Sequence, residues 1–319
     1  MADHAEAGAV RSRVLLAFAA VYLLWGSTYL AIRFAIATIP PFLMAGTRFL
    51  IAGAILFAWS RGRGAAQPTR VEWRTTAIVG ALLLVGGNGG VVWAETRVPS
   101  GVAALLVAVV PLWMVLIEWL RPRGRRPRPA VMAGVAIGLA GMLLLIGPGA
   151  ILGHGNVDPV GALVLVVAAL SWATGSLYSR HAPMPSNPLV ATGMEMLSGG
   201  ALLILAGLAA GEPARLHLDS VSLRSLLALL YLITFGAIIG FTAYTYMLKM
   251  STPARVSTYA YVNPVVAVLL GWIFAAEPVT ARMLVASAII IAAVALITLG
   301  QAPRSDAGAP TADIETKAA

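Results

Sequence analysis

The chain of 319 residues consists of long apolar runs separated by short segments that carry arginine, proline and glycine. An α-helix needs about 20 mostly apolar residues to cross the hydrocarbon core of a bilayer. Ten runs meet this requirement, at about residues 14–36, 41–60, 75–94, 101–120, 130–148, 159–179, 188–210, 223–248, 255–275 and 282–300. The runs are continuous rather than alternating, which excludes the strands of a transmembrane barrel. The sequence therefore predicts an all-α membrane protein with ten transmembrane helices.

Composition excludes several other classes of protein. Only 11% of the residues are charged and 59% are hydrophobic, whereas an average soluble domain has about 25% charged residues. The chain has no cysteine, and its lysines, Lys249 and Lys317, do not follow a phosphate-binding glycine loop. We therefore expect no cofactor, no metal site and no ATP-driven pump. Arginine clusters between the spans account for the net charge of +9, so we expect no nucleic-acid partner.

The arginines also predict the orientation of the chain. Sixteen arginines and lysines fall on the side of the two termini, and five fall on the other side. Positive residues concentrate in cytoplasmic loops, so both termini are expected in the cytoplasm and the chain in a bacterial inner membrane. We expect residues 1–13 to form an N-terminal tail and the polar residues 301–319 to form a disordered C-terminal tail. No pattern indicates a particular oligomeric state.

The second half of the chain repeats the first. At an offset of 147, WGSTYLAIR at residues 25–33 aligns with WATGSLYSR at residues 172–180, and GTRFLIAGAIL aligns with GMEMLSGGALL. An offset of 153 later places Pro111 on Pro264. Similar composition alone could produce alignments of leucine and alanine, but tryptophan, arginine and proline coincide as well. Each predicted repeat, residues 14–148 and 159–300, holds five spans, and an odd number inverts the second repeat, as in many secondary transporters.

Several polar and aromatic residues within the spans are candidates for a substrate site between the repeats. Tyr22, Trp25 and Tyr29 share one face of the first predicted helix. Trp25 lies about halfway along its span, so it is predicted to line a cavity or to pack against another helix rather than to mark the membrane interface. Trp172 and Ser176 are the counterparts of Trp25 and Tyr29 in the second repeat.

The other candidates lie on the third, eighth and ninth spans. Asn88, within the glycine-rich sequence GGNGG, could bind substrate or bridge two helices, and Trp93 follows it. Aromatic rings with hydroxyl groups suit an amino acid with a large apolar side chain, although helix packing would also use them. The residues in question are Tyr244, Tyr246, Tyr259 and Asn263.

Charges within the spans are rare. Arg48 in the second span and Glu195 in the seventh are equivalent at the offset of 147. A charge near the bilayer centre costs roughly 2.5–3.5 kcal/mol on insertion scales, so each is expected to have a partner. The two could pair or face a central cavity, and Glu195 could carry a proton during transport. Alternatively, both could extend to the interface or bind structural water. The histidines lie far apart in predicted tails or loops, so no metal-ligand spacing or catalytic dyad is present.

Motifs throughout both halves resemble one family. They are WGSTYLAIRFAI, PPFLMAGTRFLIAG, GNGGVVWAE, VPSGVAALLVAVVPLW, SWATGSLYSR, MEMLSGGALL and YAYVNPVVAVLLG. Together they resemble the EamA-type branch of the drug/metabolite transporter superfamily, in particular its metabolite and aromatic amino-acid exporters, over about residues 14–300. The resemblance implies two five-helix inverted repeats and export of small metabolites. Many members end the fourth span with a Gly-Glu pair, but this chain has Glu118 earlier and an arginine cluster after it, so no role is transferred to Glu118. The second half keeps a matching AEP sequence at Glu277.

We therefore expect a secondary transporter that exports amino acids, with aromatic or large apolar ones favoured, or related metabolites, by alternating access. Its expected partners are a small-molecule substrate and the lipid bilayer. A passive facilitator or channel, or an exporter of drugs or other metabolites, would use the same fold. An enzyme is not expected, because no catalytic cluster is visible, and a purely structural membrane protein would not need an inverted repeat with buried polar aromatics.

Overall fold

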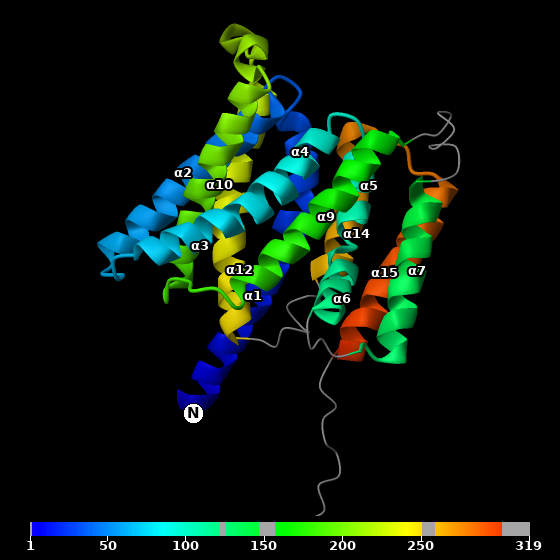
Figure 1. Cartoon of the computed structure of the whole chain (residues 1–319), viewed down its shortest axis with the longest axis horizontal. Coiled ribbons are helices and arrows are strands. Elements are labelled where there is room, and N and C mark those ends of the chain that lie inside the picture. The colour runs from blue at the N-terminus through cyan, green and yellow to red at the C-terminus, as the bar shows by residue number, and fades with distance from the viewer. Residues whose placement is uncertain (1, 122–125, 147–156, 251–258, 302–319) are drawn as a thin grey trace, which may run out of the picture.

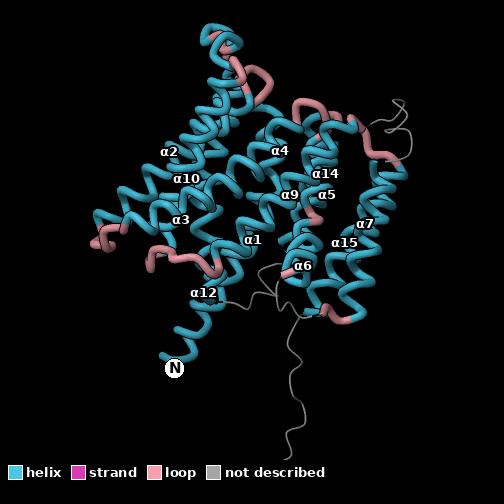
Figure 2. The backbone as a smooth tube through the Cα atoms, in the orientation of Figure 1, coloured by secondary structure: helices cyan, strands magenta, loops and turns pink. Residues whose placement is uncertain are grey.

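The computed structural model describes residues 2–121, 126–146, 157–250 and 259–301. Within these ranges every regular element is a helix, as Figure 2 shows, and the long helices lie side by side in a bundle (Figure 1). The all-α prediction is confirmed for this part of the chain. The expected C-terminal tail after residue 301 and the expected span residues 147–148 and 255–258 lie outside the described residues.

The apolar runs correspond to helices. The first half contains α1 (Ala2–Ala35), α2 (Pro41–Gly62), α3 (Arg70–Gly80), η1 (Ala81–Gly89), α4 (Gly90–Ala94), α5 (Ser100–Val107), α6 (Val110–Leu120) and α7 (Pro129–Ile146). The second half contains α9 (Pro159–Ser179), α10 (Pro188–Ala209), the 3-10 turns η2 (Glu212–Arg215) and η3 (Leu218–Ser220), α11 (Leu223–Tyr231), η4 (Leu232–Ile239), α12 (Gly240–Met250), α14 (Tyr259–Ala275) and α15 (Ala281–Gln301).

Eight helical stretches among the described residues are long and apolar enough to cross a membrane. They coincide with the first eight predicted spans, and shorter apolar helices, Val262–Ala275 and Ala281–Ile297, occupy the last two positions. The first helix begins at Ala2, so the described residues of the expected N-terminal tail continue α1. Local sequence explains several other starts, since a proline follows the N-cap of α2, α9 and α10, where its missing N–H group is not needed.

The two halves of the chain pack into each other rather than side by side. α2 contacts α10, α1 contacts α12 and α14, α9 contacts η1 and α6, and α7 contacts α15. Figure 1 shows the same interleaving, with the green helices of the second half lying between the blue and cyan helices of the first. The main helix contacts therefore join one repeat to the other.

The α2–α10 contact follows the sequence repeat. A Cβ atom on Gly46 would lie 2.7 Å from Ile204 Cδ1, and one on Gly193 would lie 2.9 Å from the main-chain nitrogen of Phe57. Gly46 and Gly193 are equivalent at the offset of 147, and so are Phe57 and Ile204. Each contact is therefore the counterpart of the other.

A second pair of contacts follows the same offset about two turns further along these helices. A Cβ atom on Gly53 would lie 2.9 Å from the main-chain nitrogen of Leu197, and one on Gly200 would lie 2.9 Å from that of Leu50. These pairs are again equivalent at the offset of 147. Reciprocal contacts of this kind are what a twofold relation between two similar chain segments produces.

Two of the spans contain a π-helical segment at matching places. The segment η1 interrupts the third span between α3 and α4, and η4 interrupts the eighth span between α11 and α12. A π-helix shifts its hydrogen bonds from i+4 to i+5 and is frequent at functional sites. The two aligned prolines differ in their surroundings, since the fourth span breaks at Ala108–Val109 just before Pro111, whereas Pro264 lies inside α14.

Candidate functional site

An aromatic cluster joins α1 to the two helices α12 and α14. The Trp25 ring centroid lies 5.3 Å from Phe241, 5.1 Å from Tyr244 and 5.3 Å from Tyr259. Tyr244 and Tyr259 are themselves 5.9 Å apart in an edge-to-face arrangement. We call these four residues the aromatic cluster. It combines one helix of the first repeat with two of the second, as expected for a site between repeats.

The polar groups beside this cluster come from the same helices. With its amide oriented as the neighbouring groups require, Asn263 donates to the main-chain oxygens of Tyr22 and Tyr259, at 3.2 and 3.3 Å. Tyr246 packs in the same small core as Trp25. Five predicted residues thus gather around Trp25: Tyr22, Tyr244, Tyr246, Tyr259 and Asn263.

Trp25 contacts the π-helical segment η4. Its indole Nε1 donates to the main-chain oxygen of Gly236 at 3.2 Å. A Cβ atom on Gly240, the residue after η4, would lie 2.5 Å from the same nitrogen. Trp25 therefore occupies space that a side chain at position 240 would need, and glycine leaves that space open.

The other repeat builds the matching contact. Trp172 packs on η1, where a Cβ atom on Gly87 would lie 2.9 Å from Trp172 Cε3. Its neighbour Ser171 donates from Oγ to the main-chain oxygen of Leu82, also in η1, at 2.7 Å. Each repeat thus places a tryptophan against the π-helical segment of the other repeat and satisfies a carbonyl there.

The remaining predicted residues lie on other parts of the bundle. Tyr29 and Trp93 pack against the larger core that α5, α6 and α9 build. The Asn88 Oδ1 atom in η1 is buried without a hydrogen-bond partner, and the main-chain oxygen of Ser176 accepts from Ser179 Oγ at 3.0 Å. The contacts described above do not join all four of these residues, Tyr29, Trp93, Asn88 and Ser176, to the aromatic cluster.

Arg48 and Glu195 do not form an ion pair, which was one of the alternatives that the sequence left open. Among the described residues, no nitrogen–oxygen distance of 4.0 Å or less joins these two side chains; the ion pairs found there are Arg97–Asp158, Arg180–Glu118 and Arg215–Glu212. The charged neighbour of Arg48 is Glu95.

Glu95 is a buried acid that the sequence did not single out. It follows α4 directly and is 0% exposed. Neither carboxyl oxygen has a hydrogen-bond partner, while its main-chain oxygen accepts from Arg33 Nη1 at 2.9 Å. The residue appears in the motif GNGGVVWAE, but a carboxylate directly after a span usually marks a helix end in water, so its burial could not be expected from the sequence.

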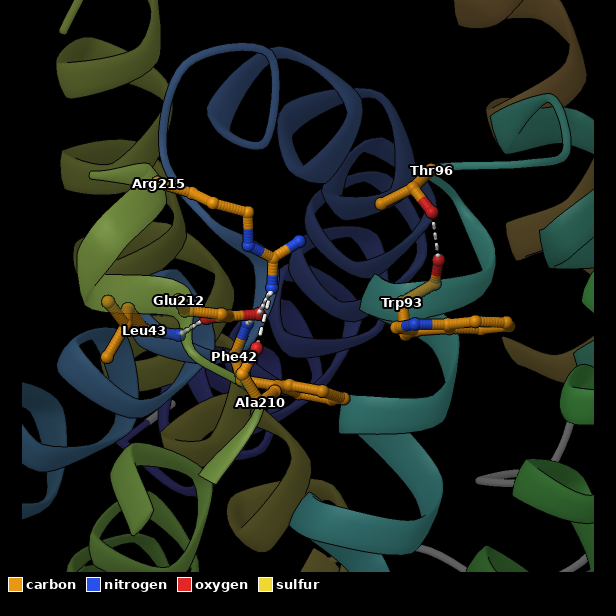
Figure 3. Close-up of polar contacts among 7 residues, drawn as sticks. All are labelled: Phe42, Leu43, Trp93, Thr96, Ala210, Glu212 and Arg215. Carbon is orange, nitrogen blue, oxygen red and sulfur yellow. Dashed lines mark hydrogen bonds and ion pairs between the residues drawn. The ribbon is translucent and has the colours of Figure 1, made fainter. Parts of the chain in front are cut away.

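Two other buried carboxylates cap helices at one face of the bundle. We call this the upper face, the top of Figure 1, where α1 ends and α2 begins. Glu212 accepts from the main-chain nitrogens of Phe42 and Leu43, at 3.1 and 2.8 Å, in the first turn of α2 (Figure 3). Its side chain is also 3.9 Å from Arg215.

Glu277 does the same for α5. It accepts from the main-chain nitrogens of Ser100 and Gly101, at 2.8 and 3.1 Å. A carboxylate at the N-terminus of a helix satisfies free N–H groups and interacts favourably with the helix dipole. The preceding residue, Ala276, has a φ of 52°, a left-handed conformation that costs a non-glycine residue roughly 1–2 kcal/mol.

Glu212 and Glu277 define a pair of contacts that we call the carboxylate caps. Both come from the second half of the chain and both bind the first turn of a helix in the first half. Close by, the Thr96 hydroxyl donates to the main-chain oxygen of Trp93 at 2.7 Å (Figure 3). The carboxylate caps therefore hold the two repeats together at the upper face.

No metal site was found in the part of the chain that the structure describes, where no three His, Cys, Asp or Glu side chains could hold a metal ion. The geometry instead consists of apolar spans, buried charges and two structurally matched halves. That combination defines a membrane transporter of the multi-span type.

Comparison with known proteins gives the family. The model of the EamA-like transporter family matches residues 12–147 and 159–299. The chain belongs to this family, which confirms the resemblance seen in its motifs, and it is a transporter rather than an enzyme. Its two matched regions follow the two halves of the repeat.

Individual relatives agree with this assignment. The chain is 41% identical over 284 residues to the uncharacterized inner membrane transporter YedA of Escherichia coli K12, covering 88% of this chain and 89% of YedA. It is 28% identical to protein PecM of Dickeya dadantii, covering 86% of this chain and 88% of PecM. A solved crystal structure covers 90% of this chain and 98% of its own length, with a TM-score of 0.62 and 27% identity.

Proposed function

We propose that this protein exports amino acids, aromatic or large apolar ones preferred, or related small metabolites across the bacterial inner membrane by alternating access. The observation that carries the proposal is the aromatic cluster, in which Trp25 of the first repeat meets Tyr244 and Tyr259 of the second. Aromatic rings stack on apolar side chains. The adjacent Asn263 amide and tyrosine hydroxyls offer donors and acceptors for the polar end of such a substrate.

The contacts between the repeats support a mechanism of alternating access. Transporters with inverted repeats move one repeat against the other around a site near the midplane. The glycines of α2 and α10 allow close helix approach, and the π-helical segments η1 and η4 are places where a helix can change its register. With the termini in the cytoplasm, the upper face is periplasmic and the carboxylate caps close it.

The test is uptake and counterflow in proteoliposomes. Purified protein is reconstituted and offered labelled phenylalanine, tyrosine, tryptophan, leucine and a panel of other metabolites. We expect saturable uptake of aromatic amino acids and acceleration by unlabelled substrate on the opposite side. Failure of every amino acid to move or compete would refute the proposed substrate class. Uptake without saturation or counterflow would instead indicate a channel or passive pore.

A matched pair of variants locates the site. Tyr259→Phe removes a hydroxyl from the aromatic cluster, whereas Tyr178→Phe removes one from the half-buried end of α9. The first should raise the KM for aromatic substrates and the second should leave it unchanged. Equal effects of the two changes would place the binding site elsewhere.

A further inference from the structure

The buried acid Glu95 has no group that stabilises its ionised form by contact. Its side chain is 0% exposed and both oxygens lack hydrogen-bond donors. Removing an ionised carboxylate from water without donors costs many kcal/mol, so such a group takes up a proton instead.

The charged and titratable groups around Glu95 come from three places in the fold. Arg33 lies on α1, Arg48 on α2 and Glu277 two residues after the end of α14, and all three interact electrostatically with Glu95. Tyr29 on α1 is a further titratable neighbour. The two arginines favour the ionised acid, while Glu277 opposes a second negative charge beside it.

Arg48 carries the opposite charge to Glu95 and is also buried. It is 3% exposed, and its Nε and Nη1 atoms have no hydrogen-bond partner. Its guanidinium group stacks on the Phe49 ring, with Cζ 4.7 Å from the ring centroid. Within the described residues, therefore, a buried cation and a buried acid interact electrostatically without forming an ion pair.

We propose that Glu95 is the proton-carrying group of the transporter, protonated while it is enclosed beside Arg48 and ionised when the upper face opens. This inference rests on the proposed function of alternating access. In the closed state the acid keeps its proton and stays apart from Arg48. In the open state the ionised carboxylate pairs with Arg48 until it accepts a proton from a hydronium ion on the periplasmic side, which forms the carboxyl O–H bond and leaves water.

The carboxylate caps connect the proton exchange of Glu95 to the opening of the upper face. Glu277, which interacts with Glu95, also binds the first turn of α5. Opening the upper face would detach α5 from Glu277 and admit water to Glu95 in one movement. A proton could then enter from the periplasm and leave to the cytoplasm while substrate moves outward.

Other acids are less suitable for this role. Glu212 and Glu277 each accept two main-chain N–H bonds, so their carboxyl groups already serve as helix caps. Glu118 is half-exposed and lies 3.8 Å from Arg180. Glu195 is half-buried in α10 and remains the rival that the experiment has to separate from Glu95.

Infrared spectroscopy tests the proton directly and needs no substrate. We expect the C=O stretching band of a protonated carboxylic acid at neutral pH, lost in Glu95→Gln and kept in the control Glu118→Gln. Glu195→Gln should also keep it. Persistence of the band in Glu95→Gln, or its loss only in Glu195→Gln, would overturn the proposal.

Transport with a pH gradient tests the coupling. We expect an outward proton gradient, with the vesicle interior more acidic, to drive substrate accumulation in exchange for protons by the unaltered protein and by Glu118→Gln. Glu95→Gln should retain counterflow but lose gradient-driven accumulation, and Glu95→Asp, which keeps a titratable acid, should recover part of it. Transport that ignores the gradient in the unaltered protein would overturn the proton role and leave the proposed function standing. Absence of any amino-acid transport would reject the substrate class, while the infrared band would still decide the state of Glu95.

Discussion

Gly80 shows how much the bundle depends on single residues. It lies at the end of α3, where a Cβ atom would be 2.5 Å from the main-chain oxygen of Glu195 and 3.0 Å from the main-chain nitrogen of Gly199. Both obstacles are backbone atoms of α10, so no rotamer change can remove them. A side chain at this position must push the two helices apart.

We predict that Gly80→Ala destabilises the protein by about 1–3 kcal/mol, the usual cost of overpacking, despite the better helix propensity of alanine. Gly62→Ala, at the end of α2, is the control, because a Cβ atom there would meet nothing within 4 Å. Thermal unfolding in detergent, followed by tryptophan fluorescence, measures both. An unchanged midpoint for Gly80→Ala would mean that α3 and α10 can separate at little cost.

At the scale of single residues, the sequence shows which positions hold unusual side chains, but it does not show which residues those side chains contact. The sequence predicts a partner for Arg48, because an arginine inside a span is costly, and the structure leaves its Nε and Nη1 atoms without a hydrogen-bond partner. Its neighbour could not be found, since the repeat offset relates equivalent positions and carries no information about contacts. Glu95 was missed for a related reason: hydropathy ends the span at residue 94, but the fold of the upper face buries the next residue.

Helices and turns were predicted better than side-chain contacts. Eight predicted spans coincide with long apolar helices because about 20 apolar residues in a row leave few alternatives. The π-helical segments were not predicted, since a shift of hydrogen bonds by one residue leaves hydropathy unchanged. The glycines of GGNGG indicated a kink or close packing, and Gly86 and Gly87 do face Ser171 and Trp172 closely.

The carboxylate caps give a prediction at the scale of elements. Glu212→Gln should loosen the first turn of α2, and Glu277→Gln should loosen the first turn of α5. Hydrogen bonds to a charged acceptor contribute roughly 1.5–3 kcal/mol, so a neutral amide should accelerate local hydrogen exchange. Mass spectrometry of peptides that contain Phe42 and Leu43, or Ser100 and Gly101, measures each effect.

Each cap variant serves as the control for the other. Glu212→Gln should leave exchange in α5 unchanged, and Glu277→Gln should leave α2 unchanged. If both helices loosened in both variants, the two caps would act as one cooperative unit rather than as separate contacts. If neither loosened, the caps would contribute nothing to closure of the upper face.

At the scale of the whole molecule, the main feature of the packing is the interleaving of the two halves of the chain. The principal helix pairs, among them α2 with α10 and α1 with α14, join one half to the other. A half expressed alone would leave these surfaces without their partners. The fold should therefore be a property of both halves together.

We predict that the halves divided between residues 150 and 155 do not fold separately but reassemble when expressed together. The measurement is co-purification through a tag on one half, followed by the proteoliposome assay. Independent folding of either half, seen as a cooperative unfolding transition of that half alone, would contradict the prediction. A split within α5, between residues 103 and 104, is the control, because it interrupts a single buried helix and should abolish assembly.

The reciprocal glycine contacts of α2 and α10 have a thermodynamic consequence. If the two repeats were identical, exchanging their conformations would turn the inward-open state into the outward-open state, and the two would be equally populated. Only residues without an equivalent can bias that equilibrium, at about tenfold for each 1.4 kcal/mol. Glu212 and Glu277 are such residues, because the matching positions at offsets of 147 and 153 hold Ala65 and Gly124. The resting state of the protein is then set by a few unmatched side chains, and exchanging those alone should reverse it.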